Sequence, residues 1–516
     1  MSDELFVAVD AGTTGTKVGV VDRAGAVVAA AYRGYPCEYP GPGRVEQSVD
    51  ALWAAECEAI AEVLTRVDAS RVVSIACSSQ RATVVPVDGC GNALAPYLGW
   101  QDRRGTAYCD ELERLVGAEA YYAMTGMAID PVASLSKIRW LQDERDDLRG
   151  DLSCFAAHQT LLLHQLGVRD HLVSPSEASY LGLLDVRRRR WHDDLAAELG
   201  VPVSLLPEVV ESGTIVGAVS ADAAASTGLR EGLPIVLGGG DLQLGALGVG
   251  ATEGVVAVGI GTGGHCVAVA PAPRLDPRRR LSCLAHVVPG HWELEGLGRA
   301  SGGTFRWFKD QLGDLESVLQ QRAHRDAYSL LIDEMPTGVG GSRGIVVIPA
   351  WAGLGAPYND GGFPGMILGL RLEHDRGALI RAFVEGITFE QRIILDAVRE
   401  VVDDVAEVRA WGGAAKADAW CQIEADVFGV PVVRTRQPDA SVIGAAVCSA
   451  VAVGAVADFT EGIATLVSPG ETFEPDPAAV ASYERYADVY RRAIDALRAA
   501  GIGDALTDLA SDAPDT

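Results

Sequence analysis

The chain has 516 residues, too many for one ordinary hydrophobic core, which predicts two or three domains. Its 48% hydrophobic and 22% charged residues are typical of a globular protein. A formal net charge of −27 disfavours binding to nucleic acid or to anionic membranes. No uninterrupted apolar stretch is long enough to span a bilayer, and the acidic start, Met-Ser-Asp-Glu, lacks the basic segment of a signal peptide. We therefore expect a cytoplasmic protein. The ten cysteines show no CxxC spacing, which argues against a zinc site or a disulfide framework.

The first 80 residues predict three antiparallel strands, a helix and a further strand. Residues 5–9 form an apolar run of the kind found in a strand buried on both faces, and strands at 17–22 and 27–31 follow after short turns. Apolar residues then recur at helical spacing from 49 to 67, with Ser48 as the N-cap. Residues 72–76 are again typical of a strand.

A similar series begins near residue 233. Apolar residues 233–237 precede Gly-Gly-Gly-Asp at 238–241, and strands at 255–258 and 266–270 flank a glycine-rich turn. A strand, a Gly/Thr turn and a second strand thus occur twice, at Asp10 and at Gly259, which indicates a weak internal duplication with a boundary near Gly250. Helices at 378–401 and 417–428 and a strand at 430–434 complete a second α/β unit. From Asp508 onward we expect a frayed tail.

The segment Asp-Ala-Gly-Thr-Thr-Gly-Thr-Lys, at 10–17, lies between two predicted strands. Its glycines permit a sharp turn whose N–H groups can approach an anion, and its threonine hydroxyls add donors. A carboxylate just before the turn can hold Mg²⁺. An ordinary tight hairpin is the alternative. Because the glycine-rich turn at 259–264 repeats the pattern, two such turns could hold a polyphosphate from both sides.

Asp241 follows a strand and begins a predicted helix, at the edge of an α/β sheet where ligands collect. A helix N-cap is an equal alternative for it. Trp100 to Arg104 combine an aromatic ring with fixed hydrogen-bonding groups, as polyol recognition requires, or else form a surface salt-bridge cluster. Gly412 to Lys416 precede an amphipathic helix and could admit a purine or a phosphate, or serve close packing alone. His265 could line a pocket, although a single His is more often structural.

Taken in order, these motifs resemble the FGGY carbohydrate kinases of the sugar kinase/actin/Hsp70 ATPase superfamily, from Leu5 to about Ala452. The resemblance is carried by DAGTTGTK at 10–17, Gln80 with Trp100-x-Asp102-x-Arg104, GGGD at 238–241, GGAAK…W…ADVFGVPV at 412–432 and GAA at 444–446. It implies an α/β fold of two actin-like ATPase (ribonuclease H-like) domains with a cleft between them. It further implies a sugar-binding domain at 1–250, a nucleotide-binding domain at 251–495 and a tail at 496–516.

The resemblance implies an ATP-dependent kinase that transfers the γ-phosphoryl group of Mg-ATP to a hydroxyl of a small sugar or polyol. Asp241 would be the general base and would help Asp10 to hold Mg²⁺. The substrate-binding residues implied are Gln80, Arg81, Trp100, Asp102, Asp241 and His265. The nucleotide-binding residues implied are Gly12, Thr13, Thr14, Lys17, Gly261, Thr262, Gly303, Gly412, Gly413 and Ala417.

The acceptor pocket departs from that of the glycerol kinases, which this chain resembles in part. Where those enzymes have a Glu after the arginine, a Gln after the catalytic Asp and a Tyr after a proline, this chain has Ala82, Leu242 and Val132. These changes remove hydrogen bonds and open volume, so we expect an acceptor larger than glycerol. A pentulose, as in xylulokinases, is favoured over the substrates of an autoinducer-2 kinase or a glycerol/polyol kinase.

A non-catalytic ATPase-fold binding protein is the alternative from another class. The expected partner is a small-molecule sugar or polyol, with no nucleic acid and no membrane. The oligomeric state is left open, with a homodimer as one alternative.

Overall fold

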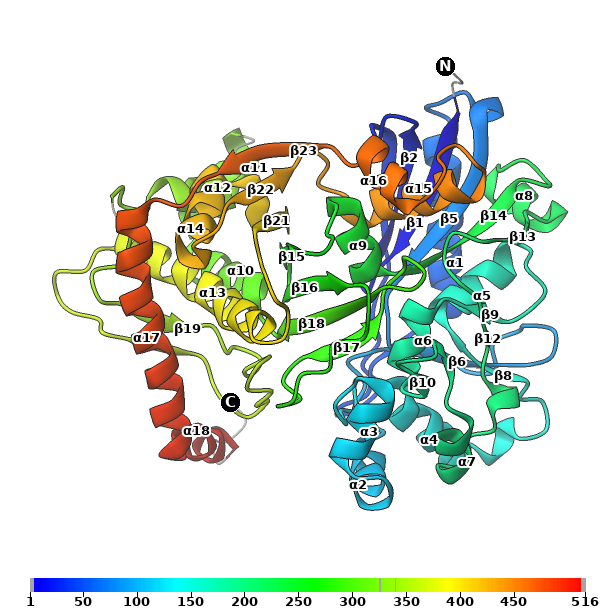
Figure 1. Ribbon diagram of the computed structural model, residues 1–516, viewed down its shortest axis with the longest axis horizontal. Coiled ribbons are helices and arrows are strands. Elements are labelled where there is room, and N and C mark those ends of the chain that lie inside the picture. Colours follow the sequence, from blue (N-terminus) through cyan, green and yellow to red (C-terminus); the bar gives the residue numbers. More distant parts are fainter. Residues whose placement is uncertain (1–3, 324–325, 339, 512–516) are drawn as a thin grey trace. The chain divides into compact units, whose positions relative to one another are not determined.

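The computed structural model describes residues 4–323, 326–338 and 340–511, in which helices and strands alternate along the chain (Figure 1). The chain forms two compact units, each built from separated segments. Unit 1 comprises Met1–Gly250, Ala270–Glu293 and Asp439–Ser468. Unit 2 comprises Ala251–Val269, Leu294–Pro438 and Pro469–Thr516.

Unit 1 holds most of the short strands. Its strands are β1 (Leu5–Ala11), β2 (Gly15–Asp22), β3 (Val27–Gly34), β4 (Glu46–Gln47), β5 (Val72–Ser79), β6 (Val84–Val87), β7 (Tyr97–Leu98), β8 (Cys154–Ala157), β9 (Leu172–Val173), β10 (Leu184–Asp185), β11 (Arg190–Trp191), β12 (Glu208–Val209), β13 (Ile215–Ala218), β14 (Pro234–Gly240) and β17 (Ser282–Ala285). Its helices are α1 (Val49–Leu64), α2 (Thr106–Leu115), α3 (Ala118–Thr125), α4 (Ser134–Glu144), α5 (His158–Leu166), α6 (Pro175–Leu181), α7 (Asp193–Glu198), α8 (Ala221–Thr227), α9 (Asp241–Val249), α15 (Ala440–Ala452) and α16 (Phe459–Leu466).

Unit 2 holds the two longest helices. Its strands are β15 (Val255–Ile260), β16 (Gly264–Ala270), β18 (Trp292–Gly298), β19 (Val346–Ile348), β20 (Met366–Leu368), β21 (Glu407–Gly412), β22 (Val432–Thr435) and β23 (Pro469–Phe473), of which Ala270, Trp292 and Glu293 count with unit 1. Its helices are α10 (Ser301–Leu312), α11 (Asp314–Ala323), α12 (Ala327–Asp333), α13 (Arg376–Arg399), α14 (Asp418–Phe428), α17 (Pro477–Ala499) and α18 (Ile502–Ser511).

Strand β1 lies inside the main sheet of unit 1, whose strand order is β13-β14-β5-β1-β2-β3. Its side chains alternate between two apolar clusters. Leu5, Val7 and Val9 pack in the cluster that includes α1, whereas Phe6 and Ala8 pack in the cluster that includes α9 and α15. Burial on both faces explains the unbroken apolar run at the start of the sequence and confirms the prediction for this strand.

The strands of unit 2 repeat the arrangement of unit 1, in the order β18-β16-β15-β21-β22-β23. Strand β15 is antiparallel to β16 and parallel to β21, which is parallel to β22. In the same way β1 is antiparallel to β2 and parallel to β5, which is parallel to β14. The outer strands β23 and β13 are both antiparallel to their neighbours. This repeated order confirms the internal duplication.

Most predicted elements agree with the observed ones to within a few residues. Ser48 is the N-cap of α1, as predicted, and accepts a hydrogen bond from the Ala51 amide. The expected frayed tail is wrong for residues 508–511, which belong to α18, while residues 512–516 lie outside the described residues. The apolar residues at 502, 505, 506 and 509 have the spacing of one helix face, a signal that the Asp and Ala content of the tail obscured.

Helix α14 of unit 2 carries a buried acid whose charge opposes folding. Glu424 is 2% exposed, and its Oε2 has no hydrogen-bond partner among the described residues. Burial raises the pKa of Glu424 from 4.5 to about 8. Between these two values the unfolded chain has released a proton that the folded chain retains, so this group makes the protein less stable as the pH rises.

We therefore expect Glu424→Gln to stabilise the protein increasingly between about pH 5 and about pH 8, by about 2 kcal/mol at the upper end. The midpoint of urea unfolding, measured for the variant and the wild type at both pH values, checks this. Glu474→Gln, at an exposed position of the same unit, is the control and should shift the midpoint equally at both. A gain that does not depend on pH would contradict the prediction.

Candidate active site

The carboxyl ends of three parallel strands meet at one edge of the unit 1 sheet. Asp10 of β1 pairs with Ser78 of β5, and Ser79 of β5 pairs with Gly240 of β14. Asp241 follows as the first residue of α9, and Gly240 takes the N-cap position. Asp241 is therefore not an N-cap, and the two predicted acids Asp10 and Asp241 lie at the same sheet edge.

The Asp241 carboxylate is held in place but remains accessible, with its side chain 32% exposed. Its Oδ1 accepts a hydrogen bond from the Leu242 amide at 2.8 Å and lies 3.3 Å from Nε of Arg81. The carbonyl oxygen of Asp241 accepts a hydrogen bond from the Ser441 hydroxyl on α15 at 3.2 Å. A carboxylate that is held in this way and is still partly exposed can accept a proton from a hydroxyl bound beside it.

Asp10 has an oxygen available for a cation. Its Oδ1 is buried and has no hydrogen-bond partner among the described residues. Burial raises the pKa of Asp10 to about 7, and the nearby charge of Asp241 contributes in the same direction. Lys17 lies opposite Asp10 in the β1–β2 pair and forms an ion pair with Asp439. A divalent cation bound here would favour the ionised form of Asp10.

The turn between β1 and β2 presents the predicted phosphate-binding groups. The Gly12 amide donates a hydrogen bond to the Gly15 carbonyl at 3.1 Å, which closes the turn. The hydroxyl of Tyr35 donates to the Gly12 carbonyl at 2.5 Å and fixes the turn from one side. Thr14 is exposed at its tip.

A chain of hydrogen bonds joins three residues predicted from separate motifs. The indole N–H of Trp100 donates to Oγ1 of Thr13 at 2.9 Å. The Thr13 carbonyl accepts from the side-chain amide of Gln47 at 2.8 Å, and Gln47 accepts from the amide of Gln80 at 2.8 Å. The structure thus brings Gln80, Thr13 and Trp100 together. Gln47 was missed because it stands alone in the sequence, outside any motif.

Asp102 is fully buried beneath the loop that carries Trp100. Its Oδ2 accepts hydrogen bonds from the Val45 amide at 2.7 Å and from Nη2 of Arg104 at 2.8 Å. Arg104 also pairs with Glu46 at 2.6 Å. These contacts make Asp102 an anchor of the loop. Its predicted contact with the substrate stays a prediction.

Two buried acids that sequence reasoning did not single out lie beside Arg81. Glu293 is fully buried and lies 3.8 Å from Nη1 of Arg81. Glu177, also buried, accepts a hydrogen bond from the Ser79 hydroxyl at 3.4 Å. Burial, followed by the charge of Asp241, raises the pKa of Glu177 well above its usual range. The sequence signals were weak, because Ser-x-x-Glu at residues 174–177 indicates a helix start and Glu293 is one of two acids, with Glu295, in a strand that belongs to no motif.

The predicted nucleotide-binding glycines of unit 2 lie close to one another. The Gly261 amide closes the β15–β16 turn by donating to the Gly263 carbonyl at 2.9 Å. The Gly303 amide donates to the Thr262 carbonyl at 2.9 Å, and the Gly413 amide donates to the carbonyl of the last residue of β15, also at 2.9 Å. Gly412 adopts a φ of 87°, which favours glycine. These hydrogen bonds hold the three glycine segments together, and the lack of side chains there lets a ligand approach the backbone closely.

The remaining predicted residues of unit 2 flank this turn region. The His265 ring packs edge-on against Trp411, with 4.7 Å between the ring centroids. Ala417 precedes α14, and its amide donates to the Ala414 carbonyl at 3.1 Å. A cavity of about 640 Å³ nearby is lined by Trp411, Gly412, Ala415, Lys416, Arg434, Thr435, Arg436, Pro438, Gly470 and Glu471. Its size and cationic side chains suit a nucleotide.

Comparisons with known proteins agree with this geometry. The family model for the N-terminal domain of the FGGY family of carbohydrate kinases matches residues 5–248, and that for the C-terminal domain matches residues 256–453. A glycerol kinase from Dechloromonas aromatica (strain RCB) is 31% identical over 504 residues, covering 95% of this chain and 97% of that protein. A gluconokinase from Bacillus subtilis (strain 168) is 27% identical over 474 residues, covering 92% and 91%. The crystal structure of xylulose kinase from Rhodospirillum rubrum superposes with a TM-score of 0.85 at 28% identity, covering 96% of this chain and 99% of that one.

The two related α/β units have the two-domain actin-like ATPase fold, and the protein is a phosphotransferase with an alcohol group as acceptor. The chain belongs to the FGGY family of carbohydrate kinases. Membership implies ATP as the phosphoryl donor and a small molecule as the acceptor. Because the relatives named above are kinases, the alternative of a non-catalytic binding protein loses its support. Within the described part of the chain, no helix is long and apolar enough to cross a membrane.

Proposed function

We propose that this protein phosphorylates a hydroxyl of a small sugar or polyol, with a pentulose as the favoured acceptor and Asp241 as the general base. The observation that carries the proposal is the position of Asp241, at the start of α9 and at the edge where β1, β5 and β14 end. Ligands of α/β proteins collect at this edge. The nearby indole of Trp100 offers an apolar face for the carbon skeleton of the acceptor.

In the proposed reaction, the acceptor hydroxyl attacks the γ-phosphorus of ATP. A bond forms between the hydroxyl oxygen and phosphorus, the bond from phosphorus to the β,γ-bridging oxygen breaks, and ADP leaves. The hydroxyl proton passes to the carboxylate of Asp241. Because phosphoryl transfer has a loose transition state, proton removal comes late, and the main task of Asp241 is to orient the hydroxyl. Arg81, 3.3 Å from that carboxylate, keeps it in position.

The residues at this edge fit a magnesium ion. Among the described residues no group of three or more His, Cys, Asp or Glu is arranged to hold a metal. Mg²⁺ at kinase sites, however, takes only one or two protein carboxylates and completes its shell with water and phosphate oxygens. We propose Asp10, through its buried and unpartnered Oδ1, as the carboxylate that holds the ion, with Asp241 nearby. The ion would neutralise charge on the transferred phosphoryl group.

The preference for a pentulose rests on the residues that replace larger polar groups of glycerol kinases. Ala82 is buried and adopts a φ of 57°, and Val132 packs against the same apolar cluster. Neither can donate or accept a side-chain hydrogen bond, so a three-carbon polyol would be held by fewer contacts. A glycerol/polyol kinase and an autoinducer-2 kinase are the alternatives.

The proposal is tested by measuring ADP release with a panel of acceptors. The panel contains pentuloses, pentitols, hexuloses, glycerol, gluconate and the autoinducer-2 precursor. We expect the highest kcat/KM with a pentulose. If every acceptor left ADP release at its basal rate, the proposed kinase function would be wrong. A clear preference for glycerol would overturn the argument from Ala82 and Val132.

A further inference from the structure

Arg81 contacts two acids and an aromatic ring before any acceptor binds. Its guanidinium lies 4.2 Å from the centroid of the Tyr180 ring. On one side its Nε is 3.3 Å from Asp241, and on the other its Nη1 is 3.8 Å from Glu293. An arginine is the side chain best suited to bind a carboxylate or phosphate group of a ligand. Here its charge is already shared between two acids of the protein.

Glu293 is fixed by its own side-chain contacts. It is fully buried, and its Oε1 accepts a hydrogen bond from the side-chain amide of Gln243 at 2.6 Å. Gln243, also fully buried, is the third residue of α9, two positions after Asp241. A Cβ built at Gly240 would lie 2.5 Å from both Cδ of Arg81 and Oε1 of Gln243, so the packing there admits only glycine. Arg81, Gln243 and Glu293 are therefore packed closely around the start of α9, which carries Asp241.

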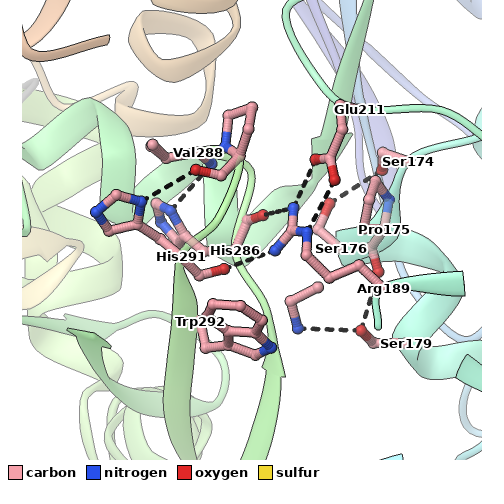
Figure 2. A network of polar contacts seen from close by, with 12 residues as sticks. Ser174, Pro175, Ser176, Ser179, Arg189, Glu211, His286, Val288, His291 and Trp292 are labelled. Carbon is pink, nitrogen blue, oxygen red and sulfur yellow. Dashed lines mark hydrogen bonds and ion pairs between the residues drawn. The ribbon is translucent and has the colours of Figure 1, made fainter. Parts of the chain in front are cut away.

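The turn before β18 is held by Arg189, whose contacts with His286, His291 and Glu211 are drawn in Figure 2. Arg189 donates hydrogen bonds to the carbonyls of His286 at 3.0 Å and of His291 at 2.6 Å, at the two ends of the turn before β18. Its guanidinium lies 5.6 Å from the ring centroid of Trp292, and Glu211 binds it with two hydrogen bonds of 2.6 and 2.9 Å. These contacts hold the turn before β18, the strand whose second residue is Glu293.

At this edge of the sheet, more than one acidic side chain lies beside the single guanidinium of Arg81. Asp241 lies 3.3 Å and Glu293 3.8 Å from the guanidinium of Arg81, and Glu177 is close enough to interact with it electrostatically. Arg81 is thus surrounded by acids of the protein itself. An acceptor carrying its own carboxylate or phosphate would be desolvated beside these acids, while the charge of Arg81 is already shared with them.

We propose that Glu293, by holding and neutralising Arg81, restricts the acceptor to uncharged polyols and ketoses and excludes sugar acids and sugar phosphates. The inference rests on the proposed function and narrows its substrate class. Glu293 acts through Arg81 and is a positioning residue rather than a catalytic one. If sugar acids are excluded, this chain differs in acceptor from its relative named gluconokinase, whose name denotes an acid as the acceptor.

The test compares xylulose, an uncharged ketose, with gluconate, a sugar acid, in the wild type and in Glu293→Gln. The wild type should prefer xylulose by at least about 100-fold in kcat/KM, because a like charge at about 4 Å costs a few kcal/mol even when partly screened. Glu293→Gln removes one negative charge at nearly constant size and frees Arg81. The ratio of kcat/KM for gluconate to that for xylulose should then rise at least about tenfold, chiefly through a lower KM for gluconate.

Two variants separate this effect from general damage to the fold. Glu56→Gln alters another fully buried acid of unit 1, which pairs with His158 at 3.1 Å, and should leave the selectivity ratio unchanged. Glu293→Asp keeps the charge and should keep the selectivity of the wild type. An unchanged ratio in a folded Glu293→Gln protein would overturn the role of Glu293.

A measurement on the wild type alone keeps the inference testable if the variant fails to fold. Gluconate should inhibit xylulose phosphorylation only at concentrations far above the KM for xylulose. Equal use of gluconate, or inhibition by it in the KM range, would overturn the exclusion while leaving the kinase proposal intact. If no acceptor is phosphorylated, the proposed function fails instead, and calorimetric titration with xylulose and gluconate still decides whether the pocket discriminates by charge.

Discussion

Asp241→Asn should lower kcat about 1,000-fold, within the range that a positioned general base contributes, and should leave ATP binding nearly unchanged. An amide cannot accept the proton of the acceptor hydroxyl. The substitution keeps the size of the side chain and its hydrogen bond from the Leu242 amide. It removes the favourable interactions of the carboxylate with the start of α9 and with Arg81, but also its repulsion of Asp10 and Glu177, so the melting temperature should change little.

Steady-state kinetics with the best acceptor and equilibrium titration with ATP measure the two quantities. Asp222→Asn is the matched control, since Asp222 is an exposed acid in the first turn of α8 in the same unit. It should retain the kcat of the wild type. If the Asp241→Asn protein turned over within about tenfold of the wild type, the general base would have to be sought elsewhere.

Gly444→Ala should destabilise the protein by about 3 kcal/mol, the upper part of the range for overpacked cores. Helices α9 and α15 pack backbone against backbone. A Cβ at Gly444 would lie 2.0 Å from the carbonyl oxygen of Leu244, and a Cβ at Gly248 would lie 1.8 Å from that of Ala440. Because backbone atoms cannot move aside as a flexible side chain can, the helices must separate. Asp241 opens α9, so kcat should fall as well.

Urea unfolding and kcat at a temperature where the variant is folded measure both effects. Gly89→Ala is the control, because a Cβ at Gly89 meets no atom within 4 Å. It should leave the unfolding midpoint and kcat where they are in the wild type. An unfolding midpoint for Gly444→Ala equal to that of the wild type would show that the two helices can shift apart at no cost.

The fold was predictable where its signals are local. The apolar run of β1, the N-cap at Ser48 and the repeated strand-turn-strand pattern each lie within a few residues of sequence, and the structure confirms all three. The grouping of segments 270–293 and 439–468 with unit 1 has no such signal. It results from packing between residues hundreds of positions apart, which no periodicity reveals. Helix α18 was not predicted because the Asp and Ala content of the tail is typical of a frayed end, although the apolar residues of this segment have the spacing of one helix face.

The site was predictable to the extent that parallel strands bring their ends together. Asp10 lies at the end of β1 and Asp241 directly follows β14 of the same sheet, so their proximity could be inferred from the pattern. Glu177 and Glu293 could not be found in this way. The role of a buried acid depends on the residues that surround it in space. The contact of Glu293 with Arg81 joins segments more than 200 residues apart, which no local pattern reveals. Asp102 is the opposite case. Its motif predicted a contact with the substrate, and the structure shows that its side chain also anchors the loop through Val45 and Arg104.

The late segment 439–468 has a consequence for how the protein is made. Helices α15 and α16 belong to the apolar cluster that contains Phe6, Ala8 and Val236, so one face of the first sheet is covered by residues synthesised more than 400 positions after β1. A nascent chain that has left the ribosome only as far as residue 250 exposes that face to solvent. Until α15 arrives, the emerging sheet is a target for chaperones and a risk for aggregation. For the same reason, we expect a fragment that ends after α9 not to fold on its own.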